Sequence, residues 1–115
     1  MDEGAIRVLL EEFGQAWNDH DLDRALAMVT DDCVFESTGP APDGVRSVGR
    51  EAVRAAWAPV FADAAARFDG EELVVQGDRA TQCWTYRFDG GHVRGIDFFR
   101  LRDGLVAEKL SYVKG

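Results

Sequence analysis

A single carboxylate, Asp97, lies within the apolar and aromatic segment Gly95-Ile96-Asp97-Phe98-Phe99. An ionised carboxylate is costly to bury, because apolar surroundings cannot replace the water that solvates its charge. A chain that buries one uses it either as a structural anchor or as a group that transfers protons. Asp97 is therefore the first candidate for chemistry, and both roles stay open on the sequence alone.

The residues around Asp97 alternate as expected for a strand over residues 92–102. Its more apolar face should turn towards the interior, and it carries Val93, Gly95, Asp97, Phe99 and Leu101. Gly95 has no side chain, so we expect it to leave open space beside the carboxylate. A pocket there, with Asp97 as general acid or base, would suit proton transfer near neutral pH.

The neighbouring strands offer two sets of partners for Asp97, because a shift of one residue exchanges the faces of a strand. On the preceding strand the expected inward residues are Gln82, Trp84 and Tyr86, and the alternative register substitutes Cys83 and Thr85. On the last strand one register places Leu110 and Tyr112 inside, and the other places Lys109 and Ser111. Tyr86 or Tyr112 would then orient a substrate or polarise its oxygen.

Aromatic residues supply the candidate walls of this pocket, although the same residue types also build ordinary cores. The candidate substrate-binding residues are Trp17, Glu36, Trp57, Phe61, Trp84, Tyr86 and Phe99. Glu36 would be a carboxylate at the rim, or else a solvated residue at the end of a strand.

Other chemistries lack their residues. The acidic cluster from Asp19 to Asp32 has the spacing of helix caps and solvated loops and lacks the pattern of a calcium loop. Cys33 and Cys83 have no metal-ligating neighbours and are expected to be small buried thiols. His20 and His92 fall at element boundaries, where surface positions are expected. No nucleophile elbow or phosphate-binding glycine loop occurs, so we expect no metal and no cofactor.

The length, composition and net charge of the chain exclude several classes of protein. The chain has 115 residues, of which 46% are hydrophobic and 30% charged, and this fits one domain spanning residues 1–115. The net charge of −8 argues against a nucleic-acid partner. No apolar run reaches the roughly 20 residues that cross a bilayer, and the acidic N-terminus does not resemble a signal peptide. We therefore expect no membrane partner and a cytoplasmic location.

Periodicity divides the chain into a helical part and a strand part. Apolar spacing predicts a helix over residues 4–18, a short second helix capped by Asp21, and a third over residues 49–67, kinked or restarted at Pro59. Between the helices, residues 33–38 are expected to form a strand and residues 39–44 a loop. Three glycine-containing turns then divide the remainder into four antiparallel strands, of which the first begins at Glu71-Glu72 and carries only exposed charge. This order predicts an α+β domain with helices packed on one face of the sheet.

The motifs along the chain resemble the nuclear transport factor 2-like superfamily. The resemblance rests on the segments 16–23, 31–36 and 48–53, and the segment 94–109 is most similar to the SnoaL-like branch. It implies a cone-shaped α+β fold, in which three N-terminal helices pack on a strongly curved, mainly antiparallel sheet. It also implies a deep apolar pocket for a small molecule and a homodimer formed through the sheet, to which Ile96 and Phe98 would contribute.

The resemblance implies a role for Asp97 but leaves the reaction open. The matching Asp is the general base in SnoaL-like polyketide cyclases and a protonated hydrogen-bond donor in ketosteroid isomerases. Where those isomerases have a helical Tyr and a base after the first strand, this chain has Phe13 and Ser37. We expect cofactor-free proton-transfer chemistry, such as cyclisation or isomerisation, on an apolar carbonyl compound. The alternative is a module with the same fold that binds a ligand or dimerises without catalysis.

Overall fold

The computed structural model describes residues 1–115 and contains three helices and one six-stranded sheet. The helices are α1 (Glu3–Asn18), α2 (Leu22–Leu26) and α3 (Arg50–Ala62). The strands are β1 (Val29–Glu36), β2 (Arg46–Val48), β3 (Arg67–Gln76), β4 (Arg79–Phe88), β5 (Gly91–Arg102) and β6 (Leu105–Val113).

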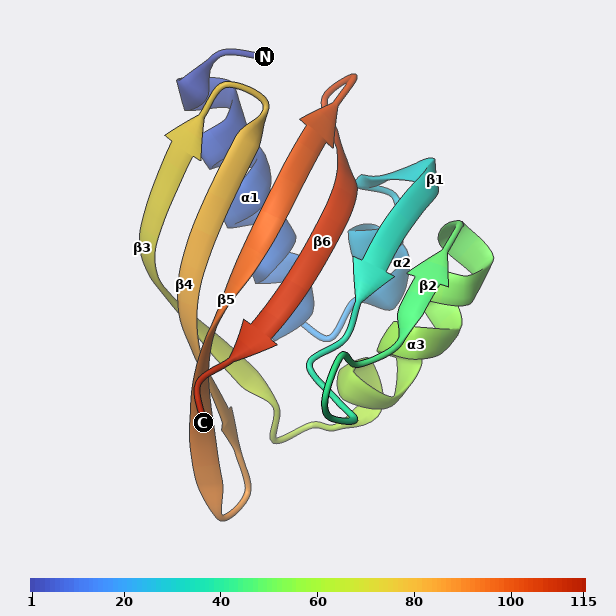
Figure 1. The fold of residues 1–115 in the computed structure, drawn as a ribbon, viewed down its shortest axis with the longest axis vertical. Coiled ribbons are helices and arrows are strands. Elements are labelled where there is room, and N and C mark those ends of the chain that lie inside the picture. Colours follow the sequence, from blue (N-terminus) through green and yellow to red (C-terminus); the bar gives the residue numbers. More distant parts are fainter.

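The sheet has the strand order β2-β1-β6-β5-β4-β3. Its neighbours pair antiparallel except β1 and β6, which run parallel. The sheet is strongly twisted, and in Figure 1 the helices lie together behind it. This arrangement confirms the predicted α+β architecture, with helices on one face of a curved and mainly antiparallel sheet. The turns predicted around residues 77, 90 and 104 separate the four long strands.

Aspartate side chains fix the starts of the first two helices. Asp2 precedes α1 and accepts a hydrogen bond from the backbone N–H of Ala5 at 2.8 Å. Asp21 precedes α2 and accepts one from the backbone N–H of Arg24 at 3.1 Å. Such caps satisfy backbone donors that the first turn leaves without partners. The predicted cap at Asp21 is confirmed, and α1 begins one residue before the predicted start.

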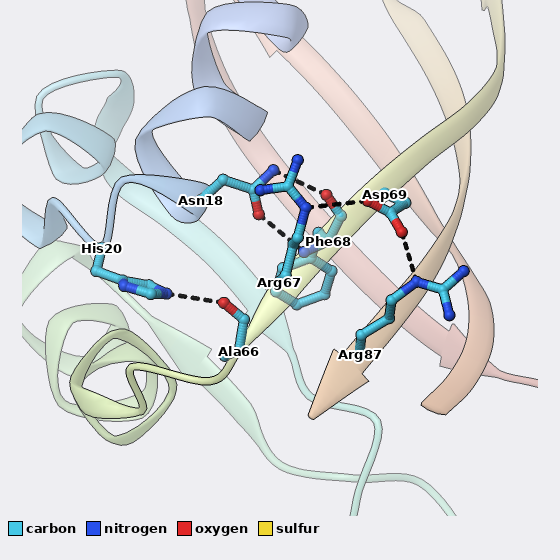
Figure 2. A network of polar contacts seen from close by, with 7 residues as sticks. All are labelled: Asn18, His20, Ala66, Arg67, Phe68, Asp69 and Arg87. Carbon is cyan, nitrogen blue, oxygen red and sulfur yellow. Dashed lines mark hydrogen bonds and ion pairs between the residues drawn. The ribbon is translucent and has the colours of Figure 1, made fainter. Parts of the chain in front are cut away.

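Helix α3 ends at Ala62, five residues before the predicted end, and it contains Pro59 without being interrupted. Two polar side chains at the C-terminal end of α1 and just beyond it bind the backbone that follows α3 (Figure 2). Asn18 donates to the carbonyl of Phe68 and accepts from its N–H, both at 2.8 Å, and His20 Nε2 lies 2.8 Å from the carbonyl of Ala66. These bonds hold residues 66–68 in an extended conformation, so β3 begins at Arg67 and not at Glu71.

The first strand also differs from its prediction. β1 begins at Val29, where a strand from Cys33 was expected, and its pairing with β6 is irregular between Val29 and Val34. The irregular stretch exposes Asp31 and Asp32, which form ion pairs with Arg50 and Arg102. The sequence pattern predicts that residues 30–32 end the second helix, whereas they belong to the irregular part of β1, where its pairing with β6 shifts.

Strand β2 was not predicted. It has three residues and pairs antiparallel with the end of β1, so that Glu36 opposes Arg46. Three residues are too few to show the alternation that identifies a strand in a sequence.

The hydrophobic core lies between the helices and the concave face of the sheet. Aromatic rings dominate it, with Phe13 and Trp17 from α1, Trp57 and Phe61 from α3, and Phe99 from β5. Trp17 packs against Trp57 with ring centroids 4.9 Å apart and against Phe61 at 4.5 Å. No helix has the length and apolar character needed to cross a membrane.

Candidate active site

Asp97 points into the protein from the middle of β5. Its neighbour on β4 is Gln82, and its neighbour on β6 is Ser111. Asp97 is 6% exposed, and Phe99 and Leu101 on the same face are buried as well. The predicted inward face of β5 is thus confirmed, and so is the β4 register that places Gln82 and Trp84 inside.

The register of β6 places Lys109 and Ser111 beside Asp97. Ser111 Oγ donates a hydrogen bond to Asp97 Oδ1 at 2.6 Å, and Lys109 Nζ donates to Ser111 Oγ at 2.9 Å. Lys109 Nζ also lies 3.4 Å from each carboxylate oxygen of Asp97. Oδ2 accepts no hydrogen bond, so this oxygen keeps lone pairs available to a ligand.

Lys109 is buried to an extent that is unusual for a lysine, since its side chain is 10% exposed. Its Nζ lies 4.8 Å from the ring centroid of Trp17 and 5.0 Å from that of Phe35. Burial lowers the pKa of Lys109 from the ordinary value of 10.5, and the nearby Asp97 opposes this change. The site therefore combines a carboxyl, an amine and a hydroxyl that can exchange protons.

A cavity of about 340 Å³ opens in front of this group. Its size is at the lower end of the range typical of small-molecule pockets. Aromatic and polar side chains from α1, β3, β4, β5 and β6 line it: Leu10, Glu11, Phe13, Gly14, Gln15, Trp17, Asn18, Phe68, Gly70, Glu71, Gln82, Trp84, Asp97, Phe99 and Lys109. Lys109 is the only basic residue among them. The cavity thus has an apolar wall, with the polar group Asp97–Lys109 as part of its lining.

Gly14 contributes open space to the cavity. A Cβ atom added at this position would meet no other atom within 4 Å. Glycine in the interior of a helix destabilises it relative to alanine, by roughly 0.5–1 kcal/mol. Its place in α1, directly on the lining, fits a position where a larger side chain would narrow the cavity.

Four of the residues expected around the pocket line the cavity, namely Asp97, Trp17, Trp84 and Phe99. Trp57 and Phe61 do not line it. They are buried in the core against Trp17, because α3 packs mainly on α2, β1 and β2, whereas the cavity is lined from α1 and β3–β6.

Tyr112 lies away from the cavity, although it was expected beside Asp97. Asp97 opposes Ser111, so alternation turns Tyr112 to the other face of the sheet, where it is 51% exposed and packs against Phe98. The prediction that Tyr112 orients a substrate here is therefore wrong for this register.

Glu36 and Tyr86 also lie outside the lining. Glu36 forms an ion pair with Arg46 at 2.8 Å at the far end of β1. Tyr86 faces inward but packs between Phe68 and Phe88, and burial raises the pKa of its hydroxyl. Neither side chain reaches the group around Asp97.

Gly95 does not leave the open space expected of it. An added Cβ would lie 2.6 Å from the ring of Trp84 and 2.2 Å from the carbonyl oxygen of Tyr112. The ring of Trp84 therefore fills the position, and glycine is required for this close approach.

Glu71 does not carry the merely exposed charge that the sequence predicts for the Glu71-Glu72 segment. Glu71 in fact lines the cavity, its carboxylate accepts a hydrogen bond from Thr85 Oγ1 at 3.3 Å, and its carbonyl accepts one from Gln82. The pairing of β3 with β4 shifts between Gly70 and Leu73, and this bulge brings Glu71 to the rim. A glycine followed by two acidic residues inside a strand was the available signal.

The remaining polar candidates have structural surroundings. His20 bonds the backbone at Ala66, and His92 is exposed. Cys33 is a buried free thiol, while Cys83 is a free thiol that is only partly buried. No group of His, Cys, Asp or Glu side chains is arranged to hold a metal ion.

Comparison with known proteins gives consistent results for sequence and structure. The SnoaL-like domain family matches residues 10–109. A nuclear transport factor 2-like protein of unknown function from Mesorhizobium loti is 37% identical, with a TM-score of 0.89 over 100% of this chain and 97% of that chain. No curated protein matches the sequence.

Two further solved structures share the fold and have names that refer to ligands. A Mycobacterium tuberculosis protein, solved in complex with estradiol-17β-hemisuccinate, is 26% identical, with a TM-score of 0.77 over 94% of this chain and 92% of that chain. A computationally designed 17-OHP binder is 24% identical, with a TM-score of 0.81 over 96% of this chain and 91% of that chain. The match over residues 10–109 and the 37% identity with the Mesorhizobium loti protein show that the chain belongs to the SnoaL-like family, within the nuclear transport factor 2-like fold.

Proposed function

We propose that the cavity binds a small, largely apolar molecule with a carbonyl oxygen and that Asp97 transfers protons to or from it. The observation that carries this proposal is the buried Asp97–Lys109 pair on the lining of a cavity whose apolar wall includes five aromatic rings: Phe13, Trp17, Phe68, Trp84 and Phe99. Aromatic walls favour a flat apolar ligand, and a few polar groups fix its orientation. The reaction needs no cofactor, since a positioned carboxyl suffices for isomerisation or cyclisation beside a carbonyl.

The geometry supports different roles for Asp97, Lys109 and Ser111. Asp97 Oδ2 accepts no hydrogen bond and is the atom that would take a proton from a ligand carbon. Lys109 and Ser111 hold the other oxygen and stabilise negative charge on the carboxylate. A ligand oxygen close to Lys109 Nζ would be polarised by the same ammonium group.

The two relatives with ligand names support the class of ligand. One was solved with a steroid derivative, and the other was designed to bind 17-OHP. Both share with this chain the fold that forms the cavity, so an apolar polycyclic ketone is a reasonable first ligand to test.

A second function is favoured by one observation. Asp97 Oδ1 is fully engaged by Ser111 and Lys109, as expected of a carboxylate that only anchors the strands. In this alternative the protein binds the same class of ligand without changing it.

A proton-exchange experiment separates the two functions. α-Tetralone, a neutral bicyclic ketone, is incubated with the protein in D₂O, and its α-proton signals are followed by NMR. Proton transfer predicts that the signals decay faster with protein than without it. Binding without exchange, detected as quenching of tryptophan fluorescence, would favour the second function, in which the protein binds the ligand without changing it.

We also propose that the outer face of the sheet forms a homodimer contact. Phe98 and Tyr112 are 44% and 51% exposed and pack edge to face with centroids 5.7 Å apart, and the partly buried Ile96 lies on the same face. Adjacent exposed aromatic rings are typical of protein interfaces.

A further inference from the structure

We propose that Lys109 forms a Schiff base with a neutral aldehyde or ketone that enters the cavity and that Asp97 moves the protons of this reaction. The inference rests on the proposed function, because it requires a carbonyl compound in the same cavity. In this inference the amine of Lys109 reacts covalently, whereas in the proposed proton transfer it acts only through its positive charge.

The position of Lys109 is the first support. Lysine side chains ordinarily keep their ammonium group in water, yet Lys109 is buried and lines the cavity. The chain has no lysine other than Lys109 and Lys114, and Lys114 is exposed at the C-terminus. The single buried amine of the protein is therefore directed to the cavity rather than to solvent.

The surroundings of Lys109 favour a neutral and nucleophilic amine. The rings of Trp17 and Phe35 lie within 5.0 Å of Nζ and replace water around it. Desolvation lowers the pKa of Lys109, although the cation–π contacts and Asp97 favour the ammonium form. Transfer of one proton from Lys109 to Asp97 converts the ion pair into a neutral amine and a carboxylic acid. Desolvated lysines of this kind attack carbonyl carbons in known covalent catalysis.

The step balances with the residues present. The lone pair of Nζ attacks the carbonyl carbon and forms a C–N bond, while the oxygen takes the proton of the Asp97 carboxylic acid. The nitrogen then returns a proton to the carboxylate. Asp97 donates this proton to the departing hydroxyl, which leaves as water, and the C=N bond of the Schiff base forms. One carbonyl and one amine are consumed, one imine and one water are produced, and no redox partner is needed.

Ser111 positions both reacting groups. Its Oγ lies 2.9 Å from Lys109 Nζ and 2.6 Å from Asp97 Oδ1, so it bridges the amine and the acid. A bridge of this length permits proton transfer through the hydroxyl as well as directly.

The charges of the lining select the class of carbonyl compound. Glu11, Glu71 and Asp97 line the cavity, and no arginine does. A keto acid would bring a further carboxylate without a guanidinium to bind it, whereas a neutral aldehyde or ketone meets no such repulsion.

Reductive trapping tests the inference. Wild-type protein is mixed with hydrocinnamaldehyde, a neutral apolar aldehyde, and sodium cyanoborohydride, which reduces an imine to a stable secondary amine. Peptide mass spectrometry then locates the adduct. We expect adduct mainly on Lys109 and little on Lys114, since the lowered pKa of Lys109 raises its neutral fraction and the cavity holds the aldehyde beside Nζ. Lys114 and the N-terminal amine serve as competitors within the same molecule, so this result does not depend on a variant folding.

Two variants sharpen the test. Lys109→Arg keeps a cation in the cavity but removes the nucleophile, and it should leave adduct only on the exposed amines. Asp97→Asn should slow trapping at Lys109 because the proton carrier is lost. Circular dichroism verifies that both variants fold.

The outcomes separate this inference from the proposed function. Quenching of tryptophan fluorescence by hydrocinnamaldehyde, with adduct only on Lys114 or the N-terminal amine, would overturn the Schiff base and leave the binding function intact. Absence of both quenching and Lys109 adduct would overturn both. Adduct on Lys109 together with quenching supports both.

Discussion

Lys109 on β6 and Asp97 on β5 form an ion pair inside the protein, with Nζ 3.4 Å from Oδ2 and both side chains at most 10% exposed. Two charged groups lose their hydration when they are buried, and the attraction between them compensates only in part. The pair lines a cavity instead of the packed core, so its position fits chemistry better than stability.

Removal of one member of the pair should destabilise the protein more than removal of both. Lys109→Met leaves the Asp97 carboxylate buried without its cation, and losses of about 3–5 kcal/mol are typical of such changes. The double variant Asp97→Leu with Lys109→Met leaves no buried charge and should be closer to wild type. Urea unfolding of wild type, Lys109→Met, Asp97→Leu and the double variant measures the coupling energy between the two residues. Additive losses within about 0.5 kcal/mol would contradict it.

The stability of the protein should depend on pH through Lys109. Because the pKa of Lys109 is lowered in the folded state, the unfolded chain binds more protons between that lowered value and 10.5. Stability attributable to Lys109 therefore rises as the pH rises through this window and is lost as the pH falls. The free energy of unfolding of wild type should rise relative to that of Lys109→Met between neutral and alkaline pH. A constant difference would show that Lys109 has no lowered pKa.

Two substitutions at Gly14 test the stability of α1 and the space in the cavity separately. Gly14→Ala should stabilise the protein by roughly 0.5–1 kcal/mol, since alanine favours the helix and the position has open space around it. Gly14→Leu keeps the helix but should weaken the binding of α-tetralone by at least about tenfold, because its side chain enters the cavity. Thermal unfolding and fluorescence titration measure the two effects. Equal affinity of both variants would show that ligands bind elsewhere.

The outer face of the sheet should determine the oligomeric state. Phe98→Glu places a charge in the centre of the exposed aromatic pair without touching the cavity, since Phe98 points away from Asp97. Light scattering after size-exclusion chromatography should give a dimer for wild type and a monomer for the variant. Lys114→Glu, outside the aromatic pair, serves as the control. A wild-type monomer would contradict the proposed contact.

The sequence was sufficient to predict the elements whose patterns are long. Apolar residues at helical spacing from Ile6 to Trp17 identified α1, and the alternation of β5 placed Asp97, Phe99 and Leu101 inside. The turns at residues 77, 90 and 104 then implied the antiparallel order. These signals are local, so they needed no knowledge of distant contacts.

The register of β6 could not be predicted in the same way. Both faces of β6 carry apolar residues, and one of them also carries Lys109 and Ser111. Burial of a lysine is disfavoured in general, and the sequence left both registers of β6 open. The pairing with Asp97 and with the ring of Trp17 reverses that preference, and these partners are distant in sequence. Similarly, the early end of α3 depends on Asn18 and His20, which bind the chain from another helix end.

The central claim is that Asp97 transfers protons to a ligand in the cavity, and exchange measured together with binding tests it most directly. Asp97→Asn keeps the size of the side chain and removes its basicity. We predict that α-tetralone still quenches the tryptophan fluorescence of this variant but that its deuterium exchange is at least about a hundredfold slower than that of wild type, in line with the usual contribution of a general base. Exchange at the wild-type rate in Asp97→Asn, with unchanged binding, would contradict the claim.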